Sequence, residues 1–169
     1  MEETLHDQER DADLVGTVLE RGGRMLAVAE SLTGGLLASV FARASGSSKW
    51  FRGGIVAYSS TVKYDLLGVP DGPVVSEAAA LSMAQGAGRL LEADVAVAVT
   101  GVGGPDPQDG EEPGTVWAAT WPDQLGDAVL LRLSGSPESI CEQVCAKTVR
   151  ILRERLDLTA GAFAGPGGA

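Results

Sequence analysis

The hydrophobic and polar positions along the chain follow two periods, one typical of helices and one typical of strands. Apolar residues at helical spacing predict helices over residues 8–21, 36–44, 60–67, 77–92 and 137–156. Short apolar runs predict buried strands over residues 26–30, 55–57 and 94–99, followed by a hairpin of strands 114–121 and 127–134. The early strands therefore alternate with helices, whereas the late strands follow one another directly.

This order of elements predicts a three-layer α/β/α domain with a mixed, partly parallel sheet. A chain of 169 residues is long enough to bury one core, so we expect a single domain over residues 10–157. Residues 1–9 are polar and predict a flexible segment, and the Gly- and Ala-rich residues 158–169 predict a disordered tail.

Composition excludes several classes of protein. The formal net charge of −10 argues against a nucleic-acid partner, which requires a basic surface. No apolar run is long enough to span a membrane, and the acidic N-terminus does not resemble a signal peptide, so we expect a cytoplasmic protein without a membrane partner. Cys141 and Cys145 are interpreted as small apolar helix positions, and with His6 they make a poor metal set, so no metal site is predicted.

The stretch MLAVAESLTGGLLASVF (25–41) presents a hydroxyl between a strand and a helix. Ser31 follows the strand, and Gly34 and Gly35 then allow a tight turn into the helix. Two interpretations stay open at this point. Ser31 is either a reactive centre beside a helix N-terminus, or it caps the helix while the glycines ease packing.

Two other groups also lie at predicted strand ends, namely Tyr58 with Lys63, and Thr100 with Gly101. Ligands of such sheets bind outside the carboxyl ends of the strands, so these groups and Ser31 predict one site. A serine can use a lysine as its base if the lysine is neutral, and nearby backbone N–H groups can stabilise an oxyanion. The combination indicates acyl transfer, although taken singly Lys63 is typical of a solvated lysine and Tyr58 of a tyrosine packed under a loop.

Five motifs together resemble the CinA C-terminal-domain family, in order and at compatible spacing over residues 10–155. They are AESLTGG (29–35), FRGGIVAYSSTVKYDLLGV (51–69), VSEAAALSMAQGA (75–87), TGVGGPD (100–106) and PGTVWAA (113–119). The resemblance, in its stand-alone form, implies conversion of nicotinamide mononucleotide to nicotinic acid mononucleotide and ammonia without metal or cofactor. It implies catalytic roles for Ser31, Tyr58 and Lys63, and it makes a homo-oligomer the expected assembly.

Contacts with the small nucleotide substrate are expected from residues of the same motifs. These are Glu30, Thr33, Gly34, Gly35, Gly53, Gly54, Thr100, Gly101, Gly103 and Gly104.

The chain departs from the family most clearly where a GDR-x-x-x-R signature usually leads into the last helix. Here the sequence is GSPESIC (135–141), with Pro137 and Cys141 in place of the two arginines. Arginine suits phosphate binding because its planar fork holds two oxygens at once. Two alternatives to a nucleotide amidase therefore remain: a non-catalytic module that binds a nucleotide or a protein partner, and an amidase whose substrate lacks the phosphate.

Overall fold

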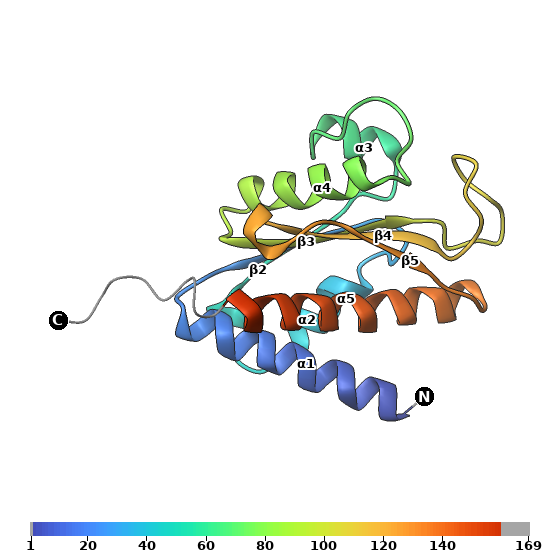
Figure 1. The fold of residues 1–169 in the computed structure, drawn as a ribbon. Coiled ribbons are helices and arrows are strands. Elements are labelled where there is room, and N and C mark those ends of the chain that lie inside the picture. The colour runs from blue at the N-terminus through green and yellow to red at the C-terminus, as the bar shows by residue number, and fades with distance from the viewer. Residues whose placement is uncertain (1, 160–169) are drawn as a thin grey trace.

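The computed structural model describes residues 2–159, and these form a five-stranded sheet with helices on both faces (Figure 1). The strands are β1 (Leu26–Glu30), β2 (Phe51–Val56), β3 (Val95–Gly101), β4 (Thr115–Trp121) and β5 (Val129–Arg132). The helices are α1 (Glu2–Arg21), α2 (Leu36–Arg43), α3 (Ser60–Asp65), α4 (Glu77–Leu90) and α5 (Pro137–Thr159), with short 3₁₀ helices η1 (Ser47–Lys49) and η2 (Asp123–Leu125). The expected three-layer α/β/α architecture with a mixed sheet is confirmed. No helix of this part of the chain is long and apolar enough to cross a membrane.

The sheet has the strand order β2-β1-β3-β4-β5. Strand β1 runs parallel to β2 and β3, whereas β4 pairs antiparallel with both β3 and β5. Glu30, the last residue of β1, is in register with Val56 of β2 and Val99 of β3. The three parallel strands therefore end at the same edge of the sheet, and the residues that follow them are neighbours.

The two faces of the sheet carry side chains of different size. In β1 and β3 valine alternates with alanine, and successive side chains of a strand point to opposite faces. Val28, Val97 and Val99 belong to the core formed with α1, α2 and α5, whereas Ala27 and Ala98 belong to the core formed with α4. Figure 1 shows these two helix layers, with α3 and α4 on one face and α1, α2 and α5 on the other.

Helix α4 approaches its neighbours closely because of its own small residues. A Cβ atom at Gly86 would lie 2.5 Å from the Leu67 carbonyl oxygen, and one at Gly88 would lie 2.6 Å from the Trp121 ring. Side chains larger than hydrogen do not fit at either position. The glycines inside this predicted helix therefore serve close packing and do not break it.

Strand β2 corrects one expectation. It was predicted as a short buried strand over residues 55–57 that Gly53 and Gly54 introduce, but both glycines lie within it. As an edge strand it is only partly buried, and Val56 is exposed. Gly54 lies under helix α2, where a Cβ atom would come within 2.7 Å of the Ala38 Cβ, so glycine here permits helix–strand contact.

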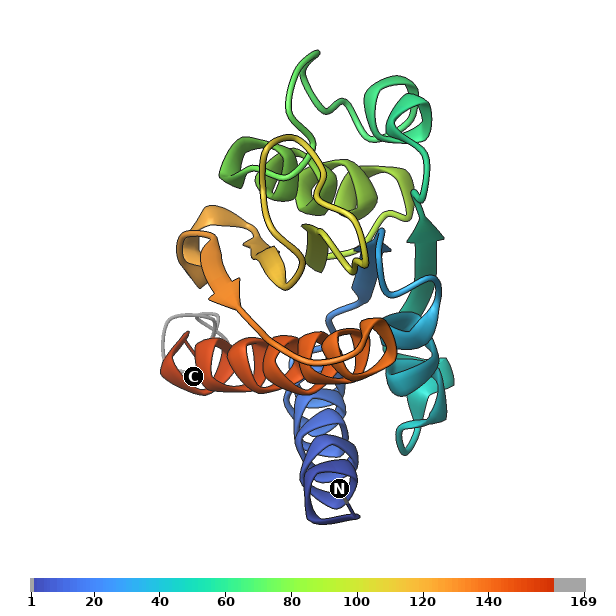
Figure 2. The same ribbon diagram turned by 90° about the vertical axis from the view of Figure 1, so that its right-hand side faces the viewer.

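The ends of the chain differ from the expected bounds. Residues 2–9, predicted as a flexible segment, form the first turns of α1, and α5 continues to Thr159. The remainder of the predicted tail, residues 160–169, lies outside the described residues. Helix α1 packs against α5 and crosses it in the view of Figure 2. Buried Asp11 of α1 forms ion pairs with Arg153 at 3.1 Å and Arg150 at 3.7 Å. These contacts hold α5 in place beside the sheet.

Candidate functional site

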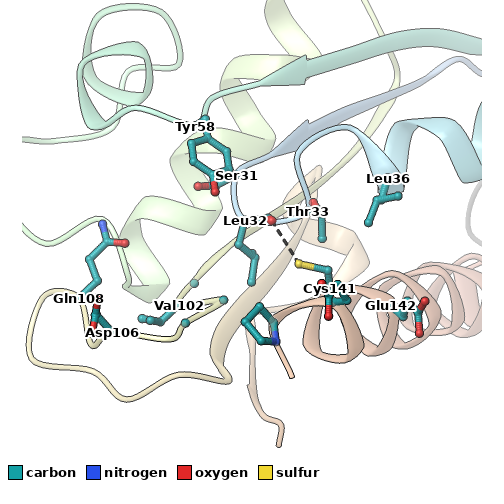
Figure 3. Close-up of a pocket in the computed structure, with 15 residues that line it drawn as sticks. Ser31, Leu32, Thr33, Leu36, Tyr58, Val102, Asp106, Gln108, Cys141 and Glu142 are labelled. Carbon is teal, nitrogen blue, oxygen red and sulfur yellow. Dashed lines mark hydrogen bonds between the residues drawn. The ribbon is translucent and has the colours of Figure 1, made fainter. Parts of the chain in front are cut away.

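A cavity of about 530 Å³ lies beyond the carboxyl ends of β1 and β3 (Figure 3). It is bounded by the turn after β1, the loop after β3 and the first turns of α5. Its lining residues are Ser31, Leu32, Thr33, Leu36, Tyr58, Gly101, Val102, Gly103, Gly104, Asp106, Gln108, Pro137, Glu138, Cys141 and Glu142. The structure therefore brings Ser31, Tyr58 and the glycine-rich loop to one cavity, at the edge of the sheet where the sequence predicts a site.

Glu30 fixes the turn that carries Ser31. Its side chain is completely buried, and its carboxylate accepts hydrogen bonds from the N–H groups of Leu37 (3.1 Å) and Ala38 (2.9 Å) in the first turn of α2. The Thr33 hydroxyl donates a third bond to it at 2.6 Å. A carboxylate is stabilised there because the first N–H groups of a helix are unpaired and carry partial positive charge. Glu30 therefore caps α2 and does not line the cavity, and its expected contact with substrate stays a prediction.

Ser31 is left free by this arrangement. The residue preceding α2 is Gly35, whose conformation is left-handed (φ 109°) and which offers no side-chain cap, so the capping task falls to Glu30. The Ser31 side chain is only 6% exposed, lines the cavity, and makes no hydrogen bond to any residue that the structure describes. Of the two interpretations of Ser31, the helix cap is therefore excluded, and what remains is an unpartnered hydroxyl on a buried residue that lines the cavity.

Tyr58 and Lys63 lie in contrasting surroundings. Tyr58 follows β2 and is 72% exposed at the rim of the cavity, so it is not packed under a loop. Lys63 of α3 is 2% exposed, does not line the cavity, and makes no side-chain hydrogen bond within the described part of the chain. Burial lowers the pKa of Lys63, and the negative charge of Asp109 opposes this shift. The lowered pKa is the direction that a general base requires.

The loop after β3 is anchored by two side chains that do not line the cavity, Thr100 at the end of β3 and Asp109 in the loop itself. The Thr100 hydroxyl is buried and donates to the Val74 carbonyl oxygen at 2.7 Å. Further along the loop, the Asp109 carboxylate accepts from the N–H groups of Val74 (2.7 Å) and Val75 (3.1 Å). Thr100 was expected to contact substrate, but the structure gives it this anchoring contact and places it outside the cavity lining.

The glycines predicted as substrate contacts fall into two groups. Gly101, Gly103 and Gly104 line the cavity, and the N–H groups of Gly103 and Gly104 make no hydrogen bond to other described residues. These N–H groups are available to an oxyanion or another acceptor. The other predicted glycines, which do not line the cavity, are Gly34, Gly35, Gly53 and Gly54.

These four glycines differ in their positions and in the hydrogen bonds of their N–H groups. Gly34 (φ 57°) donates its N–H to the Ser31 carbonyl oxygen at 3.0 Å, so this group is already engaged in the turn. The N–H of Gly35 makes no such bond to the described residues. Gly53 and Gly54 belong to strand β2. Gly34 therefore serves the turn and Gly54 the packing of α2 on β2, and the contact of the four glycines with substrate stays a prediction.

One wall of the cavity was not predicted from the sequence. It consists of Pro137, Glu138, Cys141 and Glu142 in the first turns of α5. Asp106 and Gln108 from the loop after β3 line the other side of the cavity (Figure 3). None of the described residues that line the cavity is a lysine, an arginine or a histidine. The absent GDR-x-x-x-R signature identified this segment as unusual, but its place in the cavity depends on how α5 packs. Among the described residues, no group of three or more His, Cys, Asp or Glu side chains is arranged to hold a metal ion.

Cys141 connects this wall to the turn that carries Ser31. Its thiol donates to the Leu32 carbonyl oxygen, with a distance of 3.2 Å between sulfur and oxygen. Burial raises the pKa of Cys141, and the charges of Glu138, Glu142 and Glu30 raise it further. Cys145, one turn later, is buried in the core as expected of a small apolar helix position, whereas Cys141 is a lining residue of the cavity.

The fold and the strand-end cavity define an α/β protein of the class to which the sequence motifs pointed. The family model described as the CinA C-terminal domain matches residues 8–156. The chain therefore belongs to the CinA C-terminal domain family, and the resemblance found in the sequence is confirmed.

Relatives in sequence carry names of the same kind. A competence-damage inducible protein of Halalkalibacterium halodurans is 38% identical over 144 residues, which are 82% of this chain and 34% of the relative. A protein of the same name from Bacillus anthracis is 39% identical over 145 residues, 82% of this chain and 35% of the relative. The chain thus spans about a third of the length of these curated relatives.

Solved structures confirm the fold. A CinA superfamily protein from Klebsiella pneumoniae superposes with a TM-score of 0.84 at 29% identity, covering 89% of this chain and 98% of that one. The competence/damage inducible protein CihA from Agrobacterium tumefaciens gives a TM-score of 0.80 at 33% identity, covering 88% of this chain and 95% of that one.

Proposed function

We propose that this protein hydrolyses the carboxamide of nicotinamide mononucleotide, giving nicotinic acid mononucleotide and ammonia, with Ser31 as the nucleophile and no metal ion. The observation that carries the proposal is Ser31, a buried residue that lines the cavity and whose hydroxyl has no hydrogen-bond partner among the described residues because Glu30 caps α2. The substrate itself is the one that the family resemblance implies.

In the proposed reaction the Ser31 Oγ attacks the carboxamide carbon and its proton passes to a base. The N–H groups of Gly103 and Gly104 are free to stabilise the oxyanion of the tetrahedral intermediate. The C–N bond then breaks, and the amide nitrogen leaves as ammonia with the proton that the base returns. Water hydrolyses the acyl-serine in the second half-reaction, which restores the hydroxyl and releases the acid.

Lys63 is the proposed base, because its buried position lowers its pKa and so favours the neutral amine. Lys63 makes no hydrogen bond to Ser31 among the described residues. A third group must therefore carry the proton of the Ser31 hydroxyl to the Lys63 amine. We assign this transfer to Tyr58, which lies at the rim of the same cavity and follows the strand beside β1.

Ammonia release from nicotinamide mononucleotide tests the proposal directly. The Ser31→Ala substitution is expected to lower kcat by about 1,000-fold or more, because a nucleophile has no substitute in covalent catalysis. Ser39→Ala is the matched control, since Ser39 is exposed on α2 and its side chain makes no hydrogen bond to the described residues. No activity in the parent protein, or equal activity in the Ser31→Ala variant, would refute the proposal.

A second candidate function is a module that binds a nucleotide or a protein partner without turnover. The observation in its favour is that Lys63 does not line the cavity and that no other cation among the described residues does. Calorimetric titration with nicotinamide mononucleotide and nicotinic acid mononucleotide, run beside the ammonia assay, separates the two candidates. Binding of either ligand without ammonia release supports the second.

A further inference from the structure

Three carboxylates line the cavity without partners. Glu138 and Glu142 project from α5 and Asp106 from the loop after β3, and none makes an ion pair or a hydrogen bond with another described residue. All three are exposed to solvent at the cavity wall. The cavity around Ser31 is therefore negatively charged, with no cation among its described lining residues.

The packing of α5 fixes the orientation of this wall. Ile140 and Val144 of the same turns are buried in the core, so the face that carries Glu138, Cys141 and Glu142 is directed to the cavity. Glu138 and Glu142 are four residues apart and are neighbours on the helix surface. Like charges at this spacing destabilise a helix slightly, and a positively charged ligand would remove that repulsion.

A second observation at the cavity indicates a ligand. The Ser31 side chain is more than nine-tenths buried, lines the same cavity, and its hydroxyl is unpartnered among the described residues. The thiol of Cys141 lies between the two glutamates in the sequence, and its pKa is raised by burial and then by their charges. The negative field of the wall therefore acts inside the cavity and not only in the surrounding solvent.

We propose that the wall formed by Glu138 and Glu142 selects a positively charged carboxamide without a phosphate group over its phosphorylated counterpart. This inference rests on the proposed function, because it assumes that the cavity binds a nicotinamide ligand. A nicotinamide ring joined to ribose carries one positive charge on its ring nitrogen. A phosphate adds about −1.5 to −2 charges at pH 7, so the mononucleotide is an anion while nicotinamide riboside is a cation.

The N-terminus of α5 does not compensate for the missing arginines. Pro137 has no N–H group, the Ser139 N–H donates to the Ser136 hydroxyl at 3.2 Å, and the Ile140 N–H donates to the Ser136 carbonyl oxygen at 2.9 Å. The helix dipole contributes about half a positive charge, which the carboxylate of Glu138 in the first turn more than offsets. A phosphate at this position would meet the carboxylates of Glu138 and Glu142, with the Glu138 N–H as the one first-turn donor left without a partner among the described residues.

The test compares the two substrates in the ammonia assay. In the parent protein kcat/KM is expected to be about tenfold higher for nicotinamide riboside than for nicotinamide mononucleotide, since charges near a protein surface act through an effective dielectric constant of about 20. The double variant Glu138→Gln, Glu142→Gln should bring the two values close to equality. High salt should also bring the two kcat/KM values of the parent protein closer together, because the charges of the exposed wall are screened by salt.

Glu77→Gln is the matched control. Glu77 is an exposed carboxylate in the first turn of α4, which Ser76 caps much as Ser136 caps α5, but it does not line the cavity. Its removal changes the net charge of the protein by one unit and should leave the substrate ratio unchanged. A ratio that falls in this control as much as in the double variant would mean that overall charge, and not the wall, sets the preference, and would overturn the inference.

The remaining outcomes separate this inference from the proposed function. If the parent releases ammonia from the mononucleotide as fast as from the riboside, or faster, the inference is wrong while the amidase proposal stands. If neither compound releases ammonia, the amidase proposal fails, and calorimetric affinities of the parent protein decide the inference. Tighter binding of the riboside supports it, whereas tighter or equal binding of the mononucleotide, or binding of neither, overturns it.

Discussion

The floor of the cavity is built from the ends of buried parallel strands, whereas the opposite wall is the partly exposed start of helix α5. On the floor, the charge of Glu30 is buried and accepts three hydrogen bonds, so that the neighbouring Ser31 hydroxyl is held in place and left free. On the wall, Glu138 and Glu142 are exposed and have no partners among the described residues. The floor thus positions one reactive group, and the wall sets the charge that a ligand meets.

The largest effect is expected on the floor, from Glu30→Ala. The substitution leaves the N–H groups of Leu37 and Ala38 and the Thr33 hydroxyl without their acceptor in a buried place. The free energy of unfolding should fall by about 3 kcal/mol, because hydrogen bonds to a charged group contribute about 1.5–3 kcal/mol and their unpaired donors cost more. Urea unfolding monitored by circular dichroism measures this.

On the same reasoning, activity of the Glu30→Ala variant should fall even where it remains folded, since Ser31 loses its fixed position. The control is Glu77→Ala, which removes an exposed carboxylate from the first turn of α4 and should change stability by less than about 0.5 kcal/mol. Similar losses in both variants would mean that Glu30 contributes no more than a surface charge at a helix start.

The floor could be predicted from the sequence because it follows from periodicity. The alternation of valine and alanine in β1 and β3 identifies buried strands, and the parallel arrangement then brings the residues after them to one edge. The capping role of Glu30 could not be predicted in this way. Its acceptor contacts reach seven and eight residues along the chain, beyond the one turn over which side-chain caps are recognised in a sequence.

Neither the place of the α5 wall at the cavity nor the extent of strand β2 could be predicted from the sequence, for other physical reasons. In the sequence, Glu138 and Glu142 are typical of the solvent-exposed side of an amphipathic helix. Only the packing of α5 beside the sheet shows that this side borders a cavity. In the sequence, Gly53 and Gly54 predict a turn, because glycine weakens a strand. In the structure Gly54 is needed for the contact of α2 with β2, a reason that involves two segments far apart in the sequence.

A smaller effect is expected from Lys63→Met, which removes a buried amine. In the unfolded chain Lys63 has its ordinary pKa of 10.5, and in the folded protein burial lowers this pKa. At neutral pH the unfolded state therefore binds protons more strongly, and the lysine destabilises the fold; this cost disappears as the pH rises towards 10.5. Lys63→Met should raise the free energy of unfolding by about 1 kcal/mol at pH 7, with a smaller gain at pH 10, while ammonia release is lost.

Lys147→Met is the control for this experiment, because Lys147 is exposed on α5 and makes no ion pair with the described residues. It should leave both stability and activity near the parent values. A Lys63→Met variant that is less stable than the parent at pH 7 would show that contacts of the buried lysine outweigh the cost of its burial. One that keeps full activity would remove Lys63 from the proposed mechanism.

The smallest effect is expected on the wall, at Cys141. Burial raises the pKa of its thiol, the charges of Glu138, Glu142 and Glu30 add to this, and only the thiolate reacts with iodoacetamide. Alkylation should therefore be slow at pH 7 and accelerate at higher pH than for a free cysteine. The Glu138→Gln, Glu142→Gln double variant should shift this profile to lower pH by a small amount, because burial is the larger cause and persists.

Cys145 supplies the internal comparison, since burial raises its pKa to about 12 and it should stay unmodified over the same range. Mass spectrometry of the two cysteine peptides reads both sites in one experiment. If the Cys141 profile does not move when the glutamates are neutralised, their charges do not reach the interior of the cavity, and the wall loses its influence on a bound ligand. If it moves to lower pH, the glutamate charges act on a thiol that lines the cavity and contacts the turn carrying Ser31.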